Sequence, residues 1–379
     1  MIKAVLLDMD NTLLHNPDMT FAQNFITLFE AHFTDAGFTD VRKNLRTSIQ
    51  SMSNGQLGNK TNLELATEII GNNEIDYAKQ TLKSFYSDIY PQLKHCISPI
   101  DGARELIYRL KDMGLEIVIA TNPIYPETAI KQRMEWANLP LEDGLYHLIT
   151  SADIMHFAKP DPAYYAEILG RVGIEPDEAL MLGDSLKNDI LPAKGIGIQT
   201  FHIPDARLET LNVELETLLA SNETTPLNSA MIEPQLRGNI GALYGYIDDI
   251  PPTFWHQRPD PKEWSIIQIL CHLLDSEKHN ERKRLQLILE QENPFIVQPD
   301  LPGPDIRVCN EDAYEVLHSF IDARQETIKL INGFTAEDWN KTARHSIFGL
   351  TTMLEMAHFT AQHDRLHLRQ LCQTIGRCE

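Results

Sequence analysis

Two aspartates at the end of a short apolar run are the residues best suited to chemistry. Asp8 and Asp10 lie in VLLDMDNTLL, residues 5–14, whose first half has the composition of a buried strand. Burying a carboxylate is costly unless a neighbouring group compensates its charge. In doubly wound sheets, ligands bind beyond the carboxyl ends of the strands, so the two acids lie where a site is expected.

Two other predicted strands end in polar residues that could join the same site. Thr121 and Asn122 follow EIVIA, Asp184 and Asp189 lie after EALMLG, and Lys159 lies in AKPDPAYY, ahead of the helix that leads to that strand. Several carboxylates brought together would repel one another and raise their pKa values. A hard divalent cation removes this conflict, and Mg²⁺ is the usual one where phosphates are handled. The pattern therefore predicts a magnesium site.

Taken singly, each of these residues has a simpler structural explanation. Asp8 and Asp10 could close a turn after a strand, Asp189 could cap a helix, and Asn122 could stabilise a turn. The combination of three strand ends with a lysine favours a functional site over these separate explanations.

The elements that must position these residues follow from the apolar pattern. Four β-rich runs, AVLLDMD, EIVIATN, EALMLGD and GIGIQTF, alternate with helical patterns. Continuous apolar strands separated by helices predict an α/β, Rossmann-like parallel sheet covered on both faces. Residues 16–97 interrupt the alternation with helical segments, which predicts a helical cap inserted into a domain of residues 1–220. Residues 221–231 have the composition of a linker.

Four segments, DMDNT, ATN, KPDP and GDSLKND, resemble the motifs of the haloacid dehalogenase superfamily in their order and spacing. The resemblance covers about residues 1–220. It implies that Asp8 is a nucleophile that forms an aspartyl-phosphate and that Asp10 is the general acid and base. It further implies that Thr121, Asn122 and Lys159 bind the transferring phosphoryl group.

The same resemblance implies the ligands of the metal. Asp8, the backbone carbonyl of Asp10, and Asp184 would bind Mg²⁺, with Asp189 supporting the site. Because true dehalogenases of this family lack a second acid at the position of Asp10, its presence favours a phosphatase of a small phosphorylated metabolite. Mutase and phosphonate-cleaving members share these motifs and remain alternatives.

Histidines form a second candidate site in residues 232–379. His363 and His367 are four positions apart in AQHDRLHLRQL, so both project from one face of a helix, and His272 lies in SIIQILCHLLDSE. Four helical patterns in this region predict a four-helix bundle, in which metal sites are built from inward-facing side chains. Three imidazoles suit an open divalent site for zinc, nickel or iron.

WSIIQILCHLLDSE and HSIFGLTTMLEMAHFTAQHDRLHLRQL resemble the DinB-like family of four-helix metal-binding proteins. The resemblance covers about residues 232–379 and implies that His272, His363 and His367 bind a divalent metal. Two alternatives to a phosphatase with an attached metal-binding bundle follow. The bundle could carry a metal-dependent thiol S-transferase or hydrolase activity, or it could be a non-catalytic binding or dimerisation module that forms a homodimer.

Local signals predict where two bundle helices begin and where one ends. Ser265 with Gln268, and Thr352 with Glu355, have the spacing of capping boxes. Gly376 is placed to stop the last helix after Cys372.

Composition limits the partners and the compartment. The chain has 379 residues, with 33 lysines and arginines against 54 acids, and its net charge of −21 argues against non-specific binding to nucleic acid or anionic membranes. The 5 cysteines are scattered without a CxxC pair, which favours free thiols in a reducing compartment. The N-terminus does not resemble a secretion signal, and no long apolar run occurs. We therefore expect a cytoplasmic protein.

Overall fold

The computed structural model describes residues 1–16, 18–53, 58–204, 208–220, 225–299, 309 and 312–378. The chain divides into two compact units. The first comprises Met1–Tyr165 and Pro176–Thr225, and the second comprises Ala166–Glu175 and Pro226–Glu379. The boundary after Thr225 falls within the linker predicted at residues 221–231. The exact limits of the two domains stay a prediction.

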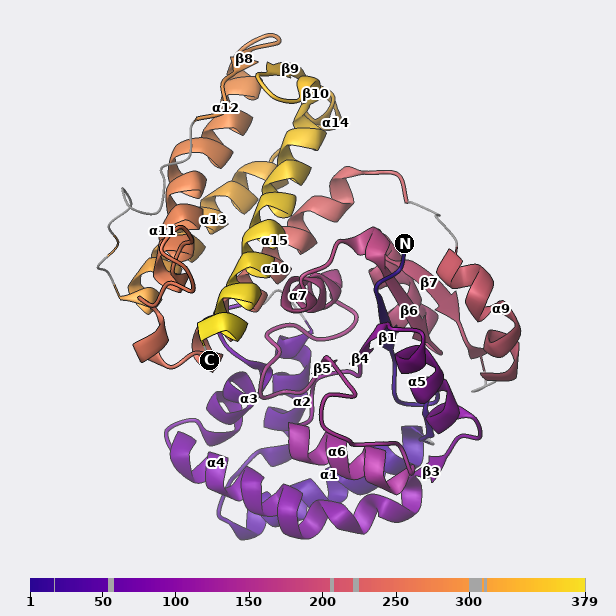
Figure 1. The fold of residues 1–379 in the computed structure, drawn as a ribbon. Helices are drawn as coiled ribbons and strands as arrows, with labels where there is room; N and C mark the ends of the chain where they lie inside the picture. Colours follow the sequence, from indigo (N-terminus) through magenta and orange to yellow (C-terminus); the bar gives the residue numbers. More distant parts are fainter. Residues whose placement is uncertain are drawn as a thin grey trace. The chain divides into compact units, whose positions relative to one another are not determined.

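The first unit is built on a parallel sheet with the strand order β5-β4-β1-β6-β7. The strands are β1 (Ala4–Leu7), β4 (Glu116–Ile119), β5 (Leu148–Ile149), β6 (Ala179–Gly183) and β7 (Gln199–His202). All of β1 and β6 is buried, as the continuous apolar runs predicted. The α/β fold class is therefore confirmed, with β1 at the centre of the sheet (Figure 1).

Helices of the predicted cap lie between β1 and β4. They are α1 (Asp18–Asp35), α2 (Val41–Met52), α3 (Asn62–Gly71) and α4 (Ile75–Ser84), and the chain continues through π- and 3₁₀-helical turns to Cys96. A short antiparallel pair, β2 (Leu14–His15) with β3 (Ser98–Pro99), joins the two ends of this insertion. Phe25, Phe29 and Phe85 pack ring against ring inside it, so the cap has an aromatic core of its own.

Four further helices lie between the strands of the sheet, and a fifth helix follows the last of these strands, β7. They are α5 (Ala103–Asp112), α6 (Glu127–Trp136), α7 (Pro162–Val172), α8 (Leu191–Gly195) and α9 (Leu208–Ala220). Helix α6 buries Ala129, Ile130, Arg133 and Met134 on one face, an arrangement in which a charged residue occupies an apolar position.

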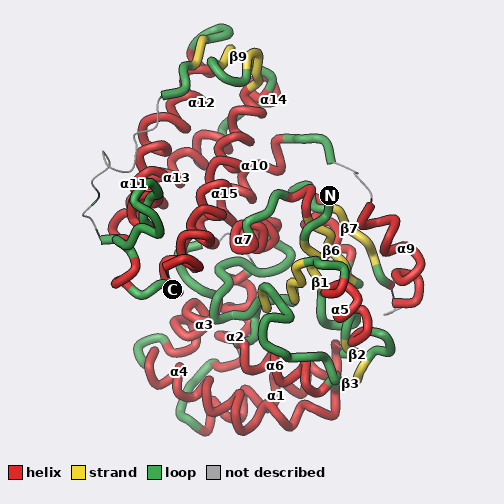
Figure 2. Tube along the Cα trace, viewed as in Figure 1, coloured by secondary structure: helices red, strands yellow, loops and turns green. Residues whose placement is uncertain are grey.

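Within the described residues of the second unit, four long helices form the predicted bundle (Figures 1 and 2). They are α10 (Ile232–Asp249), α13 (Ala313–Asn332), α15 (Met353–Cys378) and a long helix made of α11 (Ile266–Ser276), a π-helical turn (Glu277–Glu281) and α12 (Arg282–Glu290). Helix α10 packs on α13 and α15, and α11 packs on the same two helices.

Strands also occur in the bundle unit, where the sequence showed almost no strand signal. β8 (Phe295–Ile296), β9 (Thr342–His345) and β10 (Gly349–Thr352) form a three-stranded sheet at one end of the bundle (Figure 1). A short helix, α14 (Ala336–Trp339), precedes β9. These strands are too short for an alternating pattern to identify them.

Both predicted capping boxes are present, whereas the predicted stop is wrong. Ser265 and Gln268 cap α11 reciprocally, and Thr352 and Glu355 exchange backbone and side-chain hydrogen bonds at the start of α15. Helix α15 continues through Gly376 to Cys378. A single glycine lowers helix stability by only about 1 kcal/mol, which the packing of a long helix outweighs.

The expectation of free thiols is wrong for two of the five cysteines. Cys271 and Cys309 form a disulfide across a sequence separation of 38 residues. Cys96 and Cys372 are free. No helix in the described ranges is both long and apolar enough to cross a membrane. The cytoplasmic location stays a prediction.

A buried ion network joins the four long helices of the bundle. Arg324 on α13 donates one hydrogen bond to Glu277 at 2.7 Å and another to Asp364 Oδ1 on α15 at 3.1 Å. Thr327 also donates to Glu277, and Asn239 on α10 donates to Asp364 at 3.3 Å. Burial raises the pKa of Glu277, and Arg324 opposes that increase.

Replacing Arg324 with methionine is expected to lower the free energy of unfolding by about 3–5 kcal/mol, because two buried carboxylates lose their cation. The loss should grow as pH rises above the range in which free carboxyl groups titrate, since an uncompensated carboxyl is tolerated in the core only when protonated. Urea denaturation of the full chain at several pH values measures this. Lys329→Met, an exposed change on the same helix, is the control; equal effects of both would contradict the prediction.

Candidate functional site

Three of the predicted acids meet at the carboxyl ends of neighbouring strands. Asp8 follows β1, Asp184 follows β6, and Asp189 lies in the π-helical turn Leu186–Ile190 after it. One oxygen from each carboxylate lies within 4.8 Å of the other two. The sheet register, which pairs Leu7 with Leu182, brings these strand ends side by side.

Gly183 allows the approach of Asp189. A Cβ atom at position 183 would lie 2.6 Å from the Cβ and Cγ atoms of Asp189, a distance that side chains do not tolerate. The backbone N–H of Ser185 donates to Asp189 Oδ2 at 2.9 Å, which fixes the orientation of the carboxylate. Gly183 and the adjacent Asp184 therefore both contribute to this site.

Lys159 joins this cluster as its cation. Its Nζ donates to Asp8 Oδ1 and to Asp189 Oδ1, both at 2.6 Å, and all three side chains are buried. Although burial alone would lower the pKa of Lys159, the nearby Asp8 carboxylate raises it well above the ordinary value.

The negative charge around Asp8 exceeds the positive charge, so the site can accept a further cation. Burial raises its pKa to about 7, Lys159 opposes this, and the charges of Asp189 and Asp184 raise it again. Three carboxylates thus face one ammonium group, and oxygen ligands of this kind suit Mg²⁺. The donor set and its unbalanced negative charge fit the predicted metal.

Thr121 and Asn122 follow the end of β4, which is paired with β1, and Asn122 reaches the same site. Thr121 is fully buried, and its Oγ1 has no hydrogen-bond partner among the described residues. The Oδ1 atom of Asn122 is likewise buried without a partner there. Hydroxyls of Thr150 and Tyr164 donate to the Thr121 carbonyl at 2.9 and 2.8 Å and hold this turn in place. A buried hydroxyl with a free donor suits an anionic oxygen.

Asp10 lies outside the three-carboxylate cluster and has different partners. Its Oδ1 accepts a hydrogen bond from Asn16 Nδ2 at 2.7 Å and forms an ion pair with Arg133. Neither partner was identified from the sequence. The signal was present for Arg133, because it occupies the apolar face of α6 beside Ile130 and Met134.

The three clustered acids, Lys159, Asp10 and Asn122 line one small cavity. Its volume is about 330 Å³. The polar part of the lining includes Asp8, Asp10, Asn122, Lys159, Asp184 and Asp189, and the apolar part is Phe21, Ala22, Ile124 and Tyr125. The cap helix α1 therefore supplies part of the wall, which the sequence could not show.

The three predicted histidines also come together. His272 on α11 and His363 and His367 on α15 each offer a ring nitrogen within 4.8 Å of the others, and the Nε2 atoms of His272 and His363 are 3.2 Å apart. Burial lowers the pKa of His363 to about 4, so its imidazole is neutral, as a metal ligand must be.

Two neighbours orient this histidine cluster. His367 Nδ1 lies 2.9 Å from Gln370 Oε1, a contact that makes Nδ1 the donor and places the lone pair that a metal needs on Nε2. The ring of Trp264 stacks against that of His367 at an angle of 10°. The arrangement fits a divalent metal with nitrogen ligands, and no pattern in the sequence indicated that Trp264 and Gln370 belong to it.

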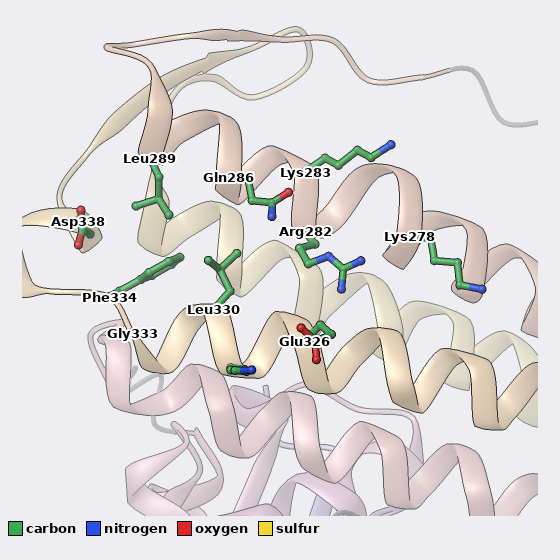
Figure 3. A pocket seen from close by; sticks show the side chains of 11 residues that line it. Lys278, Arg282, Lys283, Gln286, Leu289, Glu326, Leu330, Gly333, Phe334 and Asp338 are labelled. Carbon is green, nitrogen blue, oxygen red and sulfur yellow. The ribbon is translucent and has the colours of Figure 1, made fainter.

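A groove on the bundle surface contains none of the predicted residues. It has a volume of about 670 Å³ and lies between α13 and the helix that contains α12 (Figure 3). Lys278, Arg282, Lys283 and Lys329 line it together with Glu326 and Asp338. The groove is basic in a chain whose net charge is −21.

Two known families match the regions of the chain that contain the two candidate sites. The model of the haloacid dehalogenase-like hydrolase family matches residues 2–197, more than half of the chain. The chain belongs to this family. In this haloacid dehalogenase-like hydrolase, residues 235–371 match the DinB superfamily. Both resemblances inferred from the motifs are confirmed.

Curated relatives of the hydrolase are phosphatases. Glyceraldehyde 3-phosphate phosphatase of Pyrococcus abyssi is 34% identical over 103 residues, 27% of this chain and 40% of that protein. Phosphoglycolate phosphatase 1 of Pseudomonas aeruginosa is 27% identical over 199 residues, 52% of this chain and 67% of that protein. The chain thus spans less than half of the first relative and about two thirds of the second.

Two solved structures are similar to the two halves of this hydrolase. A phosphatase from Thermococcus onnurineus covers 53% of the chain at 21% identity, with 86% of that structure aligned and a TM-score of 0.34. YfiT from Bacillus subtilis, described as a probable metal-dependent hydrolase with an unusual four-helix bundle topology, covers 39% of the chain at 18% identity. The alignment covers 87% of the YfiT structure, with a TM-score of 0.33.

Proposed function

We propose that the first unit is a Mg²⁺-dependent phosphatase that acts through an aspartyl-phosphate on Asp8. The observation that carries this proposal is the cluster of Asp8, Asp184, Asp189 and Lys159, which lines one cavity together with Asn122. The family of the chain and its phosphatase relatives support the same reaction. Asp8 and Asp184, with the carbonyl of Asp10 and the support of Asp189, would hold Mg²⁺, which supplies positive charge to the transferring group.

In the first step, a carboxylate oxygen of Asp8 forms a bond to phosphorus while the bond from phosphorus to the ester oxygen breaks. Asp10 gives its proton to that leaving oxygen. In the second step, Asp10 takes a proton from water, the water oxygen bonds to phosphorus, and the bond from phosphorus to Asp8 breaks. Lys159 and Thr121 hold the phosphoryl oxygens, and Asn122 binds the same group.

We propose a small phosphorylated metabolite as substrate. The cavity volume of about 330 Å³ lies near the lower limit of ligand pockets. Relatives named for phosphoglycolate and glyceraldehyde 3-phosphate suggest esters of two or three carbons as the first to try.

The second unit is proposed to bind a divalent metal through His272, His363 and His367, with Zn²⁺, Ni²⁺ and Fe²⁺ as candidates. The partial exposure of His363 is compatible with a position for water or a ligand. A thiol S-transferase or hydrolase activity in the bundle and a homodimer formed through it stay predictions.

Phosphate release from sugar phosphates, phosphoglycolate, glyceraldehyde 3-phosphate and nucleoside monophosphates tests the phosphatase. The full chain should release phosphate from at least one small ester with Mg²⁺ and lose this activity in excess chelator. No release from any ester would overturn the proposal, and metal analysis of the bundle would then be the next experiment.

Magnesium affinity should fall as pH drops below about 7, because the Asp8 carboxyl, whose pKa burial raises to about 7, must lose its proton to become a ligand. Displacing one proton lowers the apparent affinity by about tenfold per pH unit. Titration calorimetry at about pH 5.5 and about pH 8 measures this. Equal affinities at the two pH values would contradict it, and Asp8→Asn should weaken binding and remove the pH dependence.

A further inference from the structure

A buried arginine outside the family motifs contacts the proposed acid and base. Arg133 lies on α6, and only 1% of its surface is exposed. Its guanidinium lies over the rings of Phe21, at 5.1 Å, and Tyr125, at 5.7 Å, both of which line the cavity. An ion pair joins it to Asp10.

The fold alone does not explain a charge at this position. The buried neighbours of Arg133 on its helix are Ala129, Ile130 and Met134, so an apolar side chain would continue the packed face. Arg133 is buried away from water, and its Nε has no hydrogen-bond acceptor among the described residues. Burying a charge in this way is costly, so a contribution elsewhere is expected.

The contact with Asp10 is specific to one oxygen. Asn16 and Arg133 both bind Oδ1, whereas the described residues provide no hydrogen bond to Oδ2. Of the Asp10 side chain, 29% is exposed, and Asp10 lines the cavity. The hydrogen bond from Asn16 and the ion pair with Arg133 hold Oδ1 and so fix the rotation of the carboxylate, which leaves Oδ2 for the leaving oxygen or for water.

We propose that Arg133 is a positioning residue that, together with Asn16, holds the Asp10 carboxylate in the orientation needed for proton transfer. The proposal rests on the proposed phosphatase function, because Asp10 needs this orientation only if it transfers protons. Arg133 acts through Asp10 and contacts no reacting atom itself. Orienting groups of this kind contribute to turnover rather than to substrate binding.

A double-mutant cycle tests the proposal on the full chain with Mg²⁺ and the best ester of the panel. Arg133→Met should lower kcat by about 10- to 100-fold, the range found for groups that orient others, with KM changed by less than about threefold. In the Asp10→Asn background, the same change should lower kcat by less than about threefold, because the residue it positions is already disabled. Arg133→Lys should recover part of the loss.

Met134→Ala is the matched control, because it removes a buried side chain from the same helix without touching Asp10. Its kcat should stay within about threefold of wild type, and melting temperatures should be compared for all variants. If Arg133→Met does not fold, Arg133→Gln and Arg133→Lys take its place in the cycle.

Two results would overturn the inference while leaving the phosphatase intact. One is an undiminished effect of Arg133→Met in the Asp10→Asn background, which would show that the two residues act independently. The other is a higher KM with unchanged kcat, which would make Arg133 a binding group for a second anionic group of the substrate. A wild-type chain that releases no phosphate from the panel would overturn both this inference and the proposed function.

Discussion

Asp8→Asn is expected to lower phosphate release by about 10⁴-fold or more, because the amide cannot form the aspartyl-phosphate. The change keeps the shape of the side chain and removes one of three clustered negative charges. Lys159 retains Asp189 as a partner at 2.6 Å. The folded state should therefore persist, and the melting temperature without metal should not fall. Release of phosphate by the purified variant, measured with Mg²⁺, checks the first expectation.

Asp112→Asn is the control for this variant, since Asp112 is an exposed acid at the end of α5. It should keep wild-type activity. An Asp8→Asn chain whose rate stays within about tenfold of wild type would exclude Asp8 as the nucleophile. A chain that loses both activity and its thermal transition would show a loss of folding instead, and Asp8→Glu would then separate the two effects.

Replacing His363 and His367 together with alanine is expected to abolish metal binding by the bundle. Two of three ligands disappear, so the affinity should fall by more than the 10- to 100-fold that loss of an orienting neighbour costs. The increase in melting temperature that a bound metal gives should vanish with it, because that increase depends on binding to the folded state. Metal content after dialysis and melting curves with added Zn²⁺, Ni²⁺ or Fe²⁺ measure both effects.

His358→Ala is the matched control for the histidine pair, since His358 lies on the same helix and outside the cluster. It should leave metal content unchanged. Undiminished metal content in the double variant would contradict the proposed site. Mg²⁺-dependent phosphate release should persist in the double variant, and its loss would instead connect the bundle metal to the phosphatase reaction.

The elements found from the sequence are those with a strong local signal. β1, β4 and β6 were identified because their apolar runs are continuous, β7 because it overlaps the run GIGIQTF, and the capping boxes because each depends on residues three positions apart. Pairs of two-residue strands, such as β2 with β3, carry no such signal. Their pairing depends on residues more than eighty positions apart, which only the folded chain brings together.

The residues of both candidate sites were likewise named from the sequence, because the types and spacing of Asp8, Asp184 and the histidine pair are local patterns. The partners of those residues were not. Arg133 reaches Asp10, Gln370 reaches His367, and Cys271 reaches Cys309 only through the path of the chain. The chemistry was therefore determined by motifs. The tertiary structure decided which groups orient and compensate them, because burial and distance depend on the packing of the whole unit.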